Sequence, residues 1–413
     1  MIKVLWVSAT IFDEQPETQS GVWVKALALK LAASQQIMLA NISVKRDIHQ
    51  VIETEYKSIK QWAIPFLRSN KKGIPPLQTQ QAFFSILSHF TPDIIYVWGS
   101  ENPLGLLPFD NSIKSVKVIA IQGVLSSISE YLLLGLSFKE ILSTFGIREF
   151  IKFRSIISIK RSFNIDGEIE KLMLQRSNYI VTQSDWTEYQ ISEINPSIKR
   201  YRTHRCLRNE FLIGKKWLEF EHNDPILYSA AVGYTLKGLH TLIRALAIVK
   251  KAFPKIKLRL AGNTGRSDFL GDGYIRLIHR MIKQYDLAKN VEWLGPLTAT
   301  QIVQNLQYSS VFINPSYVES YSLVLAEAMC IGTPSVVAYS GAMPELALDK
   351  KEALFYSPVD YKYCASAIIR LLTDLELARF ISSNALERSF IRNESFDIVQ
   401  EQLSLYEIIH TNN

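Results

Sequence analysis

Short apolar runs alternate with segments of helical periodicity along the whole chain. Segments such as Val22–Ala33 consist of good helix formers with apolar residues at helical spacing. Strands that alternate with helices favour parallel sheets with helices on both faces, so the pattern predicts an α/β protein with doubly wound sheets. The predicted strands are Val4–Ser8, Ile37–Val44, the IIYVW run after Asp93, Val116–Gln122, Tyr179–Thr182, Pro225–Ala231, Lys257–Ala261, Val291–Leu294, Val311–Asn314 and Ser335–Ala338.

The stretch Val311–Glu345 combines two of these strands with a helix over about Tyr321–Ile331. Gly332 and Pro334 end this helix, because a left-handed cap and a proline ring both stop helical backbone. A strand, a helix and another strand make a βαβ unit with parallel strands. Ligands of such sheets bind at the carboxyl ends of the strands. The polar loop after the first strand and the loop Ser340–Glu345 after the second therefore predict a binding crevice.

The length of 413 residues allows two or three domains, each with a sizeable core. The composition becomes basic at KRYRTHRCLR (Lys199–Arg208), and a new strand then starts the second half. We therefore predict an N-terminal domain over 1–205, a C-terminal domain over 206–395 and a final helical segment over 396–413. Two αβ domains of similar size predict a cleft between them as the small-molecule site.

Charge and cysteine content narrow the classes of protein. The 46 Lys and Arg residues outnumber the 39 Asp and Glu residues, which fits an anionic ligand or membrane surface. Nucleic acid is not expected, because no basic run or recognition motif stands out. The three cysteines lack CxxC spacing, so we expect reduced thiols without a disulfide framework or zinc site. Neither signal-peptide features nor a run of about 20 apolar residues occurs, which predicts a cytoplasmic protein, free or at the inner face of the membrane.

The segment Ser126–Phe163 interleaves Leu, Ile and Phe with basic residues. Amphipathic basic helices of this kind can lie in an anionic membrane interface. The same pattern also fits a pair of helices that cover the sheet with their apolar faces. The sequence leaves both interpretations open.

Glu319 and Glu327 are candidate ligand-binding carboxylates. Glu319 lies in the loop at the end of a strand, and Glu327 lies about two turns into the following helix. Unpaired N–H groups at the helix start, expected at Ser320–Leu323, would point into the crevice with the positive end of the helix dipole. A phosphate fits there, and a neighbouring carboxylate suits sugar or ribose hydroxyls. Alternatively, Glu319 caps the helix and Glu327 is a solvated helix residue.

Other strand ends carry residues that suit phosphate. Lys237-Gly238 follows the strand in LYSAAVGYTLKGLHTLIRAL, where a mobile ammonium can meet phosphate charge, although a lone lysine there also fits a solvated loop. Gly262 ends the strand in LRLAGNT at the same edge. Gly21 precedes a helix in the first half, where an anion could approach backbone N–H groups, although one glycine without GxGxxG also fits simple helix entry.

Together these features resemble the retaining glycosyltransferases of the GT-B fold, family 4, known as group 1 glycosyl transferases. The resemblance is close over most of Pro225–Leu372 and covers the first half in outline. It implies two Rossmann-like domains that face each other across a cleft, with the final segment 396–413 crossing back to the N-terminal domain. The motifs that carry it are Gly21, VGYTLKGLHTLIRAL, LRLAGNT, VEWLGPL, INPSYVESYSLVLAEAMCIGTPSVV, SGAMPEL and EALFYSPVD.

The resemblance implies that the second domain holds a nucleotide-sugar donor. Lys237 and Glu319 are the implied catalytic residues, since Lys237 would neutralise the diphosphate leaving group and Glu319 would contact the donor sugar. Glu327 would bind the ribose hydroxyls. No Asp-x-Asp motif occurs, so neither a metal nor another cofactor is expected, and a UDP-sugar is the favoured substrate. The other implied donor-binding residues are Gly21, Gly233, Gly262, Leu297, Ser322 and Leu323.

The chain departs from the family pattern at three places. Ser320–Ser322 stands where the family usually has Gly-Phe-Gly, which could crowd the sugar pocket or change the sugar accepted. Tyr234 lies where an arginine is common, and Arg208 or Arg266 are candidate substitutes for that cation. Gln122 follows a first-domain strand where many members carry histidine, and it could hydrogen-bond a sugar hydroxyl.

We therefore expect a metal-independent hexosyltransferase that moves a sugar from a nucleotide-diphosphate sugar to a hydroxyl acceptor with retention of configuration. The expected acceptor is a glycan or a lipid-linked molecule in bacterial cell-surface polysaccharide or glycolipid synthesis, reached with peripheral membrane contact through 126–163. Two alternatives stay open: a non-hydrolysing nucleotide-sugar 2-epimerase, and a catalytically inactive nucleotide-sugar-binding subunit.

Overall fold

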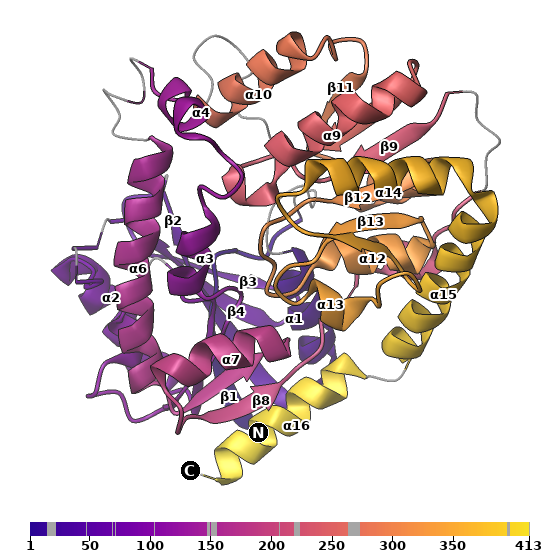
Figure 1. Ribbon diagram of the computed structural model, residues 1–413. Coiled ribbons are helices and arrows are strands. Elements are labelled where there is room, and N and C mark those ends of the chain that lie inside the picture. The colour runs from indigo at the N-terminus through magenta and orange to yellow at the C-terminus, as the bar shows by residue number, and fades with distance from the viewer. Residues whose placement is uncertain are drawn as a thin grey trace. The chain divides into compact units, whose positions relative to one another are not determined.

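The computed structural model describes residues 1–14, 22–46, 48–67, 69–70, 72–102, 104–146, 149, 155–205, 207–218, 224–262, 273–394 and 397–412. The chain divides into two compact units, coloured along the sequence in Figure 1. Unit 1 consists of Met1–Ile128, Phe163–Cys206 and Phe396–Asn413, and unit 2 consists of Ser129–Ser162 and Leu207–Ser395. Gly21 and Arg266 lie outside the described residues, so their roles stay predictions.

Unit 1 contains an eight-stranded sheet with the strand order β3-β4-β2-β1-β5-β6-β7-β8. Neighbouring strands are parallel except for the antiparallel pair β3–β4 at one edge. Lys57 and Ser58 join this pair with φ angles of 47° and 66°, as a two-residue hairpin turn requires. The strands are β1 (Ile2–Val7), β2 (Ile37–Lys45), β3 (Ile52–Tyr56), β4 (Ile59–Pro65), β5 (Ile94–Trp98), β6 (Val116–Ala120), β7 (Tyr179–Thr182) and β8 (Lys199–Arg202).

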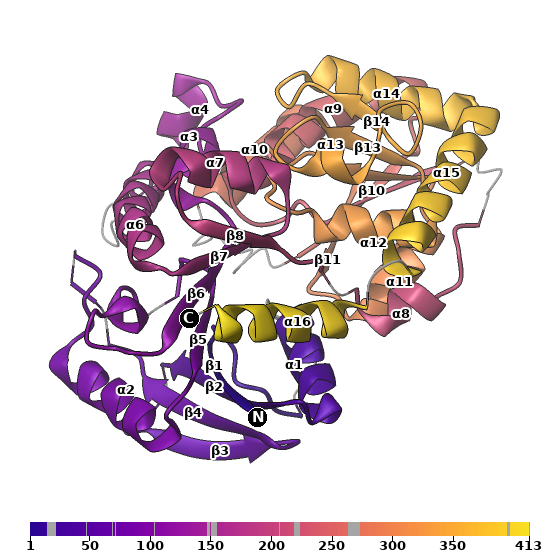
Figure 2. The same ribbon diagram turned by 90° about the horizontal axis from the view of Figure 1, so that it is seen from below.

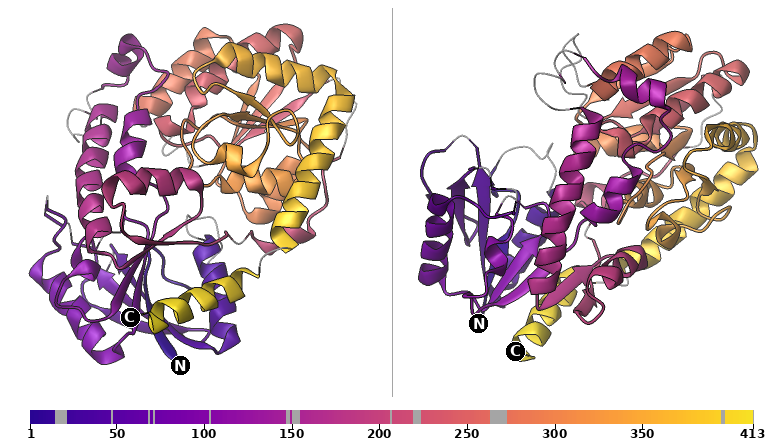
Figure 3. Two further views of the ribbon diagram at one scale, coloured as in Figure 1. Left: turned by 60° about the horizontal axis from the view of Figure 1, so that its bottom comes forward. Right: turned by 60° about the vertical axis from the view of Figure 1, so that its left-hand side comes forward.

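Helices cover both faces of this sheet (Figure 2). The C-terminal helix α16 packs beside α1 on one face (Figure 3), where the Trp6 Nε1 group donates to the Tyr406 hydroxyl at 2.8 Å. On the other face α2 and α6 bury Phe83 and Met173 against the strands. The helices around this sheet are α1 (Val22–Ser34), α2 (Leu77–Phe90), α3 (Leu125–Tyr131), α6 (Ile156–Arg176), α7 (Asp185–Ile194), α16 (Ile398–Thr411) and the 3₁₀ turn η1 (Leu107–Phe109).

Unit 2 contains a six-stranded sheet with the order β11-β10-β9-β12-β13-β14, and its neighbouring strands are all parallel. The prediction of an α/β fold with doubly wound sheets is therefore confirmed. The strands are β9 (Ile226–Ser229), β10 (Lys257–Ala261), β11 (Val291–Gly295), β12 (Val311–Asn314), β13 (Ser335–Ala338) and β14 (Leu354–Tyr356). The helical elements are α4 (Phe138–Ser143), α8 (Asn209–Ile213), η2 (Thr235–Lys237), α9 (Leu239–Ala252), α10 (Gly273–Gln284), α11 (Ala299–Gln307), α12 (Leu323–Ile331), α13 (Met343–Leu346), α14 (Tyr361–Thr373) and α15 (Leu375–Glu394).

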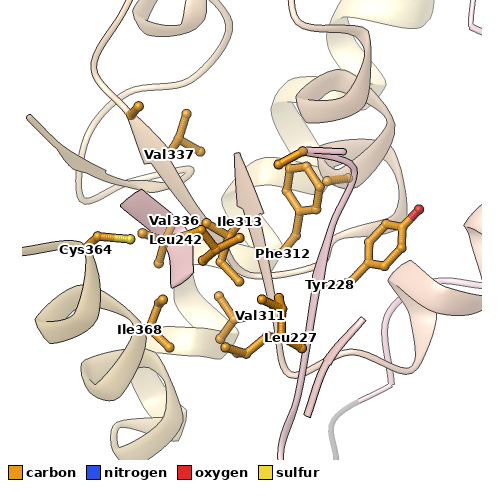
Figure 4. Close-up of a cluster of buried hydrophobic side chains, with 14 of the residues drawn as sticks. Leu227, Tyr228, Leu242, Val311, Phe312, Ile313, Val336, Val337, Cys364 and Ile368 are labelled. Atoms are coloured by element: carbon orange, nitrogen blue, oxygen red, sulfur yellow. The ribbon is translucent and has the colours of Figure 1, made fainter. Parts of the chain in front are cut away.

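The central strands of unit 2 are apolar on both faces, because helices cover both (Figure 4). On one face Leu242 of α9 and Ile368 of α14 pack against strand residues such as Val311. On the other face the rings of Tyr228 and Phe312 lie side by side, with their centroids 6.2 Å apart. This two-sided core fixes the strands whose carboxyl ends carry the candidate site.

We call Ser129–Ser162 the crossing segment, because it comes from the first half of the sequence and packs in unit 2. Arg244 on α9 donates to the Gly135 carbonyl at 3.0 Å and to Glu140 at 2.5 Å, and Arg276 on α10 contacts Glu149 at 2.5 Å. Figure 1 shows α4 lying against α10. The predicted N-terminal domain over 1–205 included this segment, so the unit boundaries differ from the prediction here.

His240, on α9, contacts the crossing segment through the backbone of Leu134. Its Nε2 atom lies 3.0 Å from the Leu134 carbonyl oxygen and 2.7 Å from the Tyr317 hydroxyl, and its Nδ1 atom lies 2.8 Å from the Tyr274 hydroxyl. Burial lowers the pKa of His240 to about 3, so the imidazole is neutral and each nitrogen has a hydrogen-bond partner. The role of His240 is therefore structural.

Candidate active site

The loop between β12 and α12 is held by its own polar side chains. The Ser322 side chain caps α12 by accepting from the Leu325 N–H at 3.3 Å. Asn314, at the end of β12, donates its Nδ2 group to the same Ser322 oxygen at 2.8 Å. The helix begins at Leu323, about two residues later than predicted, because Ser322 acts as its cap. Ser320 and Tyr321 therefore precede the helix and do not belong to its first turn. The backbone N–H groups of Ser322 and Leu323 have no partner among the described residues.

The loop after β9, which carries Lys237, packs directly against the loop after β12. The N–H of Tyr317 donates to the Leu236 carbonyl at 2.8 Å. Gly238 has a φ of +66°, and a Cβ there would lie 2.0 Å from the Pro315 carbonyl oxygen. Only glycine fits this backbone conformation and this close approach. Two strand-end loops that are far apart in sequence are thus packed together.

This packing brings Lys237 and Glu319 into contact. The Lys237 Nζ atom lies 2.8 Å from Glu319 Oε1, with 31% of the Lys237 side chain and 14% of the Glu319 side chain exposed. Burial alone would lower the pKa of Lys237, but the Glu319 carboxylate outweighs it and holds the pKa above its usual value. Lys237 therefore carries a positive charge at a partly open position.

A second loop, between β13 and α13, fixes the backbone of Glu319. The N–H of Ala342 donates to the Glu319 carbonyl at 2.8 Å. Gly341 has a φ of +53°, and a Cβ there would lie 2.2 Å from the Glu319 carbonyl oxygen. Both strand-end loops that the sequence marked as a crevice are therefore in contact with each other.

Glu327, on α12, forms a buried ion pair with Arg208. The Arg208 guanidinium lies 2.9 Å from Glu327 Oε1, and only 15% of Arg208 and 9% of Glu327 remain exposed. Burial raises the pKa of Glu327, and the guanidinium opposes that shift. The interpretation of Glu327 as a solvated helix residue is wrong, because the side chain is buried. From the sequence we considered Arg208 only as a candidate phosphate-binding cation, and nothing in the segment around it indicated that it pairs with Glu327.

The remaining predicted donor-binding residues lie at the carboxyl ends of neighbouring strands in unit 2. Gly233 has a φ of +143° and open space where a Cβ would stand. Gly262 has a φ of +129°, and its N–H donates to the Gly295 carbonyl at 2.9 Å. Leu297 follows β11 and is half-buried against the core of unit 2. Gln122 follows β6 in the sheet of unit 1 and is also half-buried.

The described residues contain no cluster of His, Cys, Asp and Glu that could hold a metal ion. Over the same residues, no helix is long and apolar enough to cross a membrane. The described cysteines, Cys330 and Cys364, are buried and free. Among the residues that the structure describes, the candidate site of unit 2 contains the ion pairs Lys237–Glu319 and Arg208–Glu327.

Comparisons with known proteins agree with this architecture. Residues 213–388 match the family of glycosyl transferases group 1. An uncharacterized glycosyltransferase of Methanocaldococcus jannaschii is 26% identical over 183 residues, which is 44% of this chain and 44% of that protein, so the match spans less than half of that relative.

Solved structures resemble the whole chain. The sucrose-phosphate synthase of Thermosynechococcus elongatus superposes with a TM-score of 0.77 at 18% identity, covering 100% of both chains. The Anabaena protein HepE, solved in complex with UDP-glucose, superposes with a TM-score of 0.67 at 15% identity, covering 100% of both chains. The fold shared with these glycosyltransferases is the GT-B fold, as predicted.

Proposed function

This chain carries a group 1 glycosyl transferase region at residues 213–388 within a GT-B fold, and from that premise we propose that it transfers a sugar from a nucleotide-diphosphate sugar to a hydroxyl acceptor. The observation that carries the proposal is the Lys237–Glu319 contact of 2.8 Å at the carboxyl ends of β9 and β12. Parallel αβ sheets bind their ligands at this edge. A cation beside a carboxylate there suits a substrate that combines phosphate with sugar hydroxyls.

We assign the residues of this site as follows. The Lys237 ammonium would neutralise the charge that develops on the leaving diphosphate, helped by the N–H groups of Ser322 and Leu323 at the start of α12. Glu319 would hydrogen-bond the donor sugar and Glu327 the ribose. Because lysine and backbone donors supply the positive charge, the reaction would need no metal. Retention of configuration follows the family resemblance.

The donor is also a proposal. The HepE structure contains UDP-glucose, which favours a UDP-sugar for this chain as well. Leu297 would lie near the base, Gly233 and Gly262 would let the nucleotide approach the backbone, and Gln122 would contact a sugar hydroxyl. A thermal-shift screen of the purified chain against UDP-, ADP- and GDP-sugars tests this, since a ligand that binds only the folded state raises its stability.

Substitution of the two paired residues tests the assignment of catalysis. Lys237→Ala and Glu319→Gln should each lower kcat by about 10²–10³-fold while leaving the melting temperature close to that of the wild type. Lys250→Ala and Glu292→Gln are matched controls, because each removes one partner of an exposed ion pair in the same unit. Normal turnover by Lys237→Ala or Glu319→Gln would refute the role of that residue.

Two other functions share the nucleotide-sugar site. A 2-epimerase would convert a nucleotide sugar without any acceptor, whereas a transferase would release free nucleotide by slow hydrolysis. An inactive binding subunit would bind a nucleotide sugar tightly and turn over none of a broad acceptor panel. Incubation of the purified protein with each donor, followed by chromatography of the nucleotide products, separates the three.

The exposed face of α4 supports a membrane-linked acceptor. Phe138 and Leu142 of α4 are 75% and 52% exposed, Phe145 shortly after the helix is 43% exposed, and Lys139 lies on α4 as well. Apolar side chains beside a cation suit an anionic lipid surface, and a lipid-linked glycan acceptor would be found there. Cosedimentation with vesicles that contain anionic lipid, but not with neutral vesicles, is expected. A Phe138→Ser, Leu142→Ser variant with unchanged cosedimentation would refute this contact.

A further inference from the structure

The pair formed by Arg208 and Glu327 is more enclosed than the pair formed by Lys237 and Glu319. Exposure is 15% and 9% in the first pair but 31% and 14% in the second. Arg208 comes directly before α8, and its guanidinium stacks over the ring of Phe211 at 4.9 Å from the ring centroid. A planar guanidinium that is held by a ring on one side and a carboxylate on the other has little rotational freedom. Arg208 is therefore built into unit 2 as a fixed group.

The contact uses only one of the two carboxylate oxygens. Arg208 lies 2.9 Å from Oε1 of Glu327, and Oε2 has no hydrogen-bond partner among the described residues. A carboxylate oxygen whose orientation is fixed and which keeps its lone pairs can accept a hydrogen bond from a ligand hydroxyl. The geometry suits a ligand that presents hydroxyl groups.

We propose that Arg208 is a positioning residue that holds the Glu327 carboxylate by Oε1 and thereby presents Oε2 to the ribose hydroxyls of the nucleotide. The inference rests on the proposed function, because it takes the ligand to be a nucleoside diphosphate. It differs from the role that the sequence indicated for Arg208, since a phosphate clamp would need the guanidinium free for phosphate oxygens. Arg208 acts through Glu327 and does not touch the reacting atoms.

The charges around Glu327 give this role a pH signature. Burial raises the pKa of Glu327, and Glu210 at the start of α8 adds to that effect, whereas Arg208 lowers it. The buried Tyr228 hydroxyl, which lacks a partner among the described residues, lies within the field of the same pair and stays protonated. Arg388, on the neighbouring helix α15, is directed to the carbonyls of Glu345 and Leu346. Removal of Arg208 would therefore raise the pKa of Glu327 further, because the group that opposes the effect of burial would be gone.

The test measures binding and not turnover. Calorimetry of the full chain with UDP, ADP and GDP and with their 2′,3′-dideoxy analogues would be carried out at pH 7 and pH 9. For the nucleotide that binds, Arg208→Met should weaken affinity about tenfold at pH 7, and the loss should be smaller at pH 9, where a carboxyl with a raised pKa is more fully ionised. Its affinity for the dideoxy analogue should change by less than about twofold, since the hydroxyls that Glu327 would bind are missing. Arg208→Lys should restore part of the affinity.

Arg259→Met is the matched control, because Arg259 pairs with Glu292 at an exposed position of the same unit and should leave affinity unchanged. Equal losses for the nucleotide and its dideoxy analogue at both pH values would overturn the proposal in favour of a phosphate contact. Unchanged affinity in Arg208→Met would overturn it in favour of a purely structural pair. If Arg208→Met does not fold, the same comparison in Arg208→Lys decides. Absence of binding by the wild type to all three nucleotides would refute the proposed function itself.

Discussion

Glu170 in unit 1 and Glu327 in unit 2 are both buried, and they differ in how many of their carboxylate oxygens the protein itself uses as acceptors. Glu170, on α6 of unit 1, is 0% exposed and accepts from the Ser100 hydroxyl and from the N–H groups of Leu125 at 3.0 Å and Ser126 at 3.4 Å. These N–H groups belong to the first turn of α3, so the buried carboxylate supplies acceptors for donors that the helix itself leaves unpaired. Among the described residues it has no ion-pair partner.

Glu327 in unit 2 is almost as deeply buried, with 7% of the whole residue exposed, but a guanidinium neutralises it and one carboxylate oxygen has no partner among the described residues. Burial by itself therefore does not distinguish a structural carboxylate from a binding one. The distinction comes from the acceptor positions that the protein leaves unused. Both oxygens of Glu170 accept hydrogen bonds within the protein, whereas one oxygen of Glu327 has no partner among the described residues and is the one that we propose binds a ligand.

Removal of the Glu170 carboxylate should produce the largest effect. Glu170→Leu leaves buried donors around Ser100 and Leu125 without their acceptor, so the free energy of unfolding should fall by roughly 3 kcal/mol. Nucleotide affinity should stay within about twofold of the wild type. Urea denaturation and calorimetry measure the two quantities. A loss of nucleotide affinity together with unchanged stability would reverse the roles assigned to Glu170 and Glu327.

The same carboxylate should make stability depend on pH. Burial raises the pKa of Glu170 to about 7 from 4.5, so between these values the folded state binds a proton that the unfolded state does not. Stability is therefore greatest at low pH within this window and should fall by about 2–3 kcal/mol between pH 5 and pH 8. Glu170→Gln, which has no charge to bury, should lose most of this slope in denaturation measured across the range. An equal slope in the variant would mean that another group is responsible.

A backbone change in unit 2 should affect chemistry more than stability. In Gly341→Ala the new Cβ would stand 2.2 Å from the Glu319 carbonyl oxygen, so the loop that carries Glu319 must shift. We expect kcat/KM to fall by about tenfold to a hundredfold, since small displacements of a positioned group cost that much. Gly295→Ala is the control, because Gly295 has a φ of +70° but open space around a Cβ. Equal activity losses in both variants would attribute the effect to backbone strain alone.

The smallest effect is expected at the cap of α12. Ser322→Ala removes the acceptor of the Leu325 N–H and of the Asn314 side chain, and it should lower the free energy of unfolding by about 1 kcal/mol. Thr298→Ala, which removes the equivalent cap of α11, should cost about the same. A much larger decrease in kcat for Ser322→Ala than for Thr298→Ala would show that Ser322 has a role beyond capping.

The spacing of apolar residues predicted secondary structure well where a short apolar run is also buried. The strands Val311–Asn314 and Ser335–Ala338 have the predicted bounds, because each is a short apolar run bounded by turn residues. The pattern missed the hairpin of β3 and β4, since β3 is a polar, exposed edge strand with the sequence IETEY. The start of α12 was placed too early, because a serine cap cannot be told from a loop serine by pattern alone.

From the sequence we predicted only those residues of the candidate site that lie in a loop after a strand or on the helix that follows it. Lys237 and Glu319 both follow strands, so the topology of parallel sheets predicted that they lie at the same edge of the sheet, but their ion pair was not predicted. The pairing of Glu327 with Arg208 was also not predicted, because Arg208 lies 119 residues away in a segment without a strand-end motif. Pairing of side chains that are far apart in sequence depends on tertiary packing, and the local pattern of a single sequence does not predict it.

The crossing segment also has a consequence for the gene. Because Ser129–Ser162 packs in unit 2 and Phe396–Asn413 packs in unit 1, no single cut in the chain separates two complete units. A recombination event or an engineered chimera that exchanged only the second half would separate Arg244 and Arg276 from their partners Glu140 and Glu149. Exchange of the whole of unit 2 between relatives must therefore carry two non-contiguous pieces of sequence together.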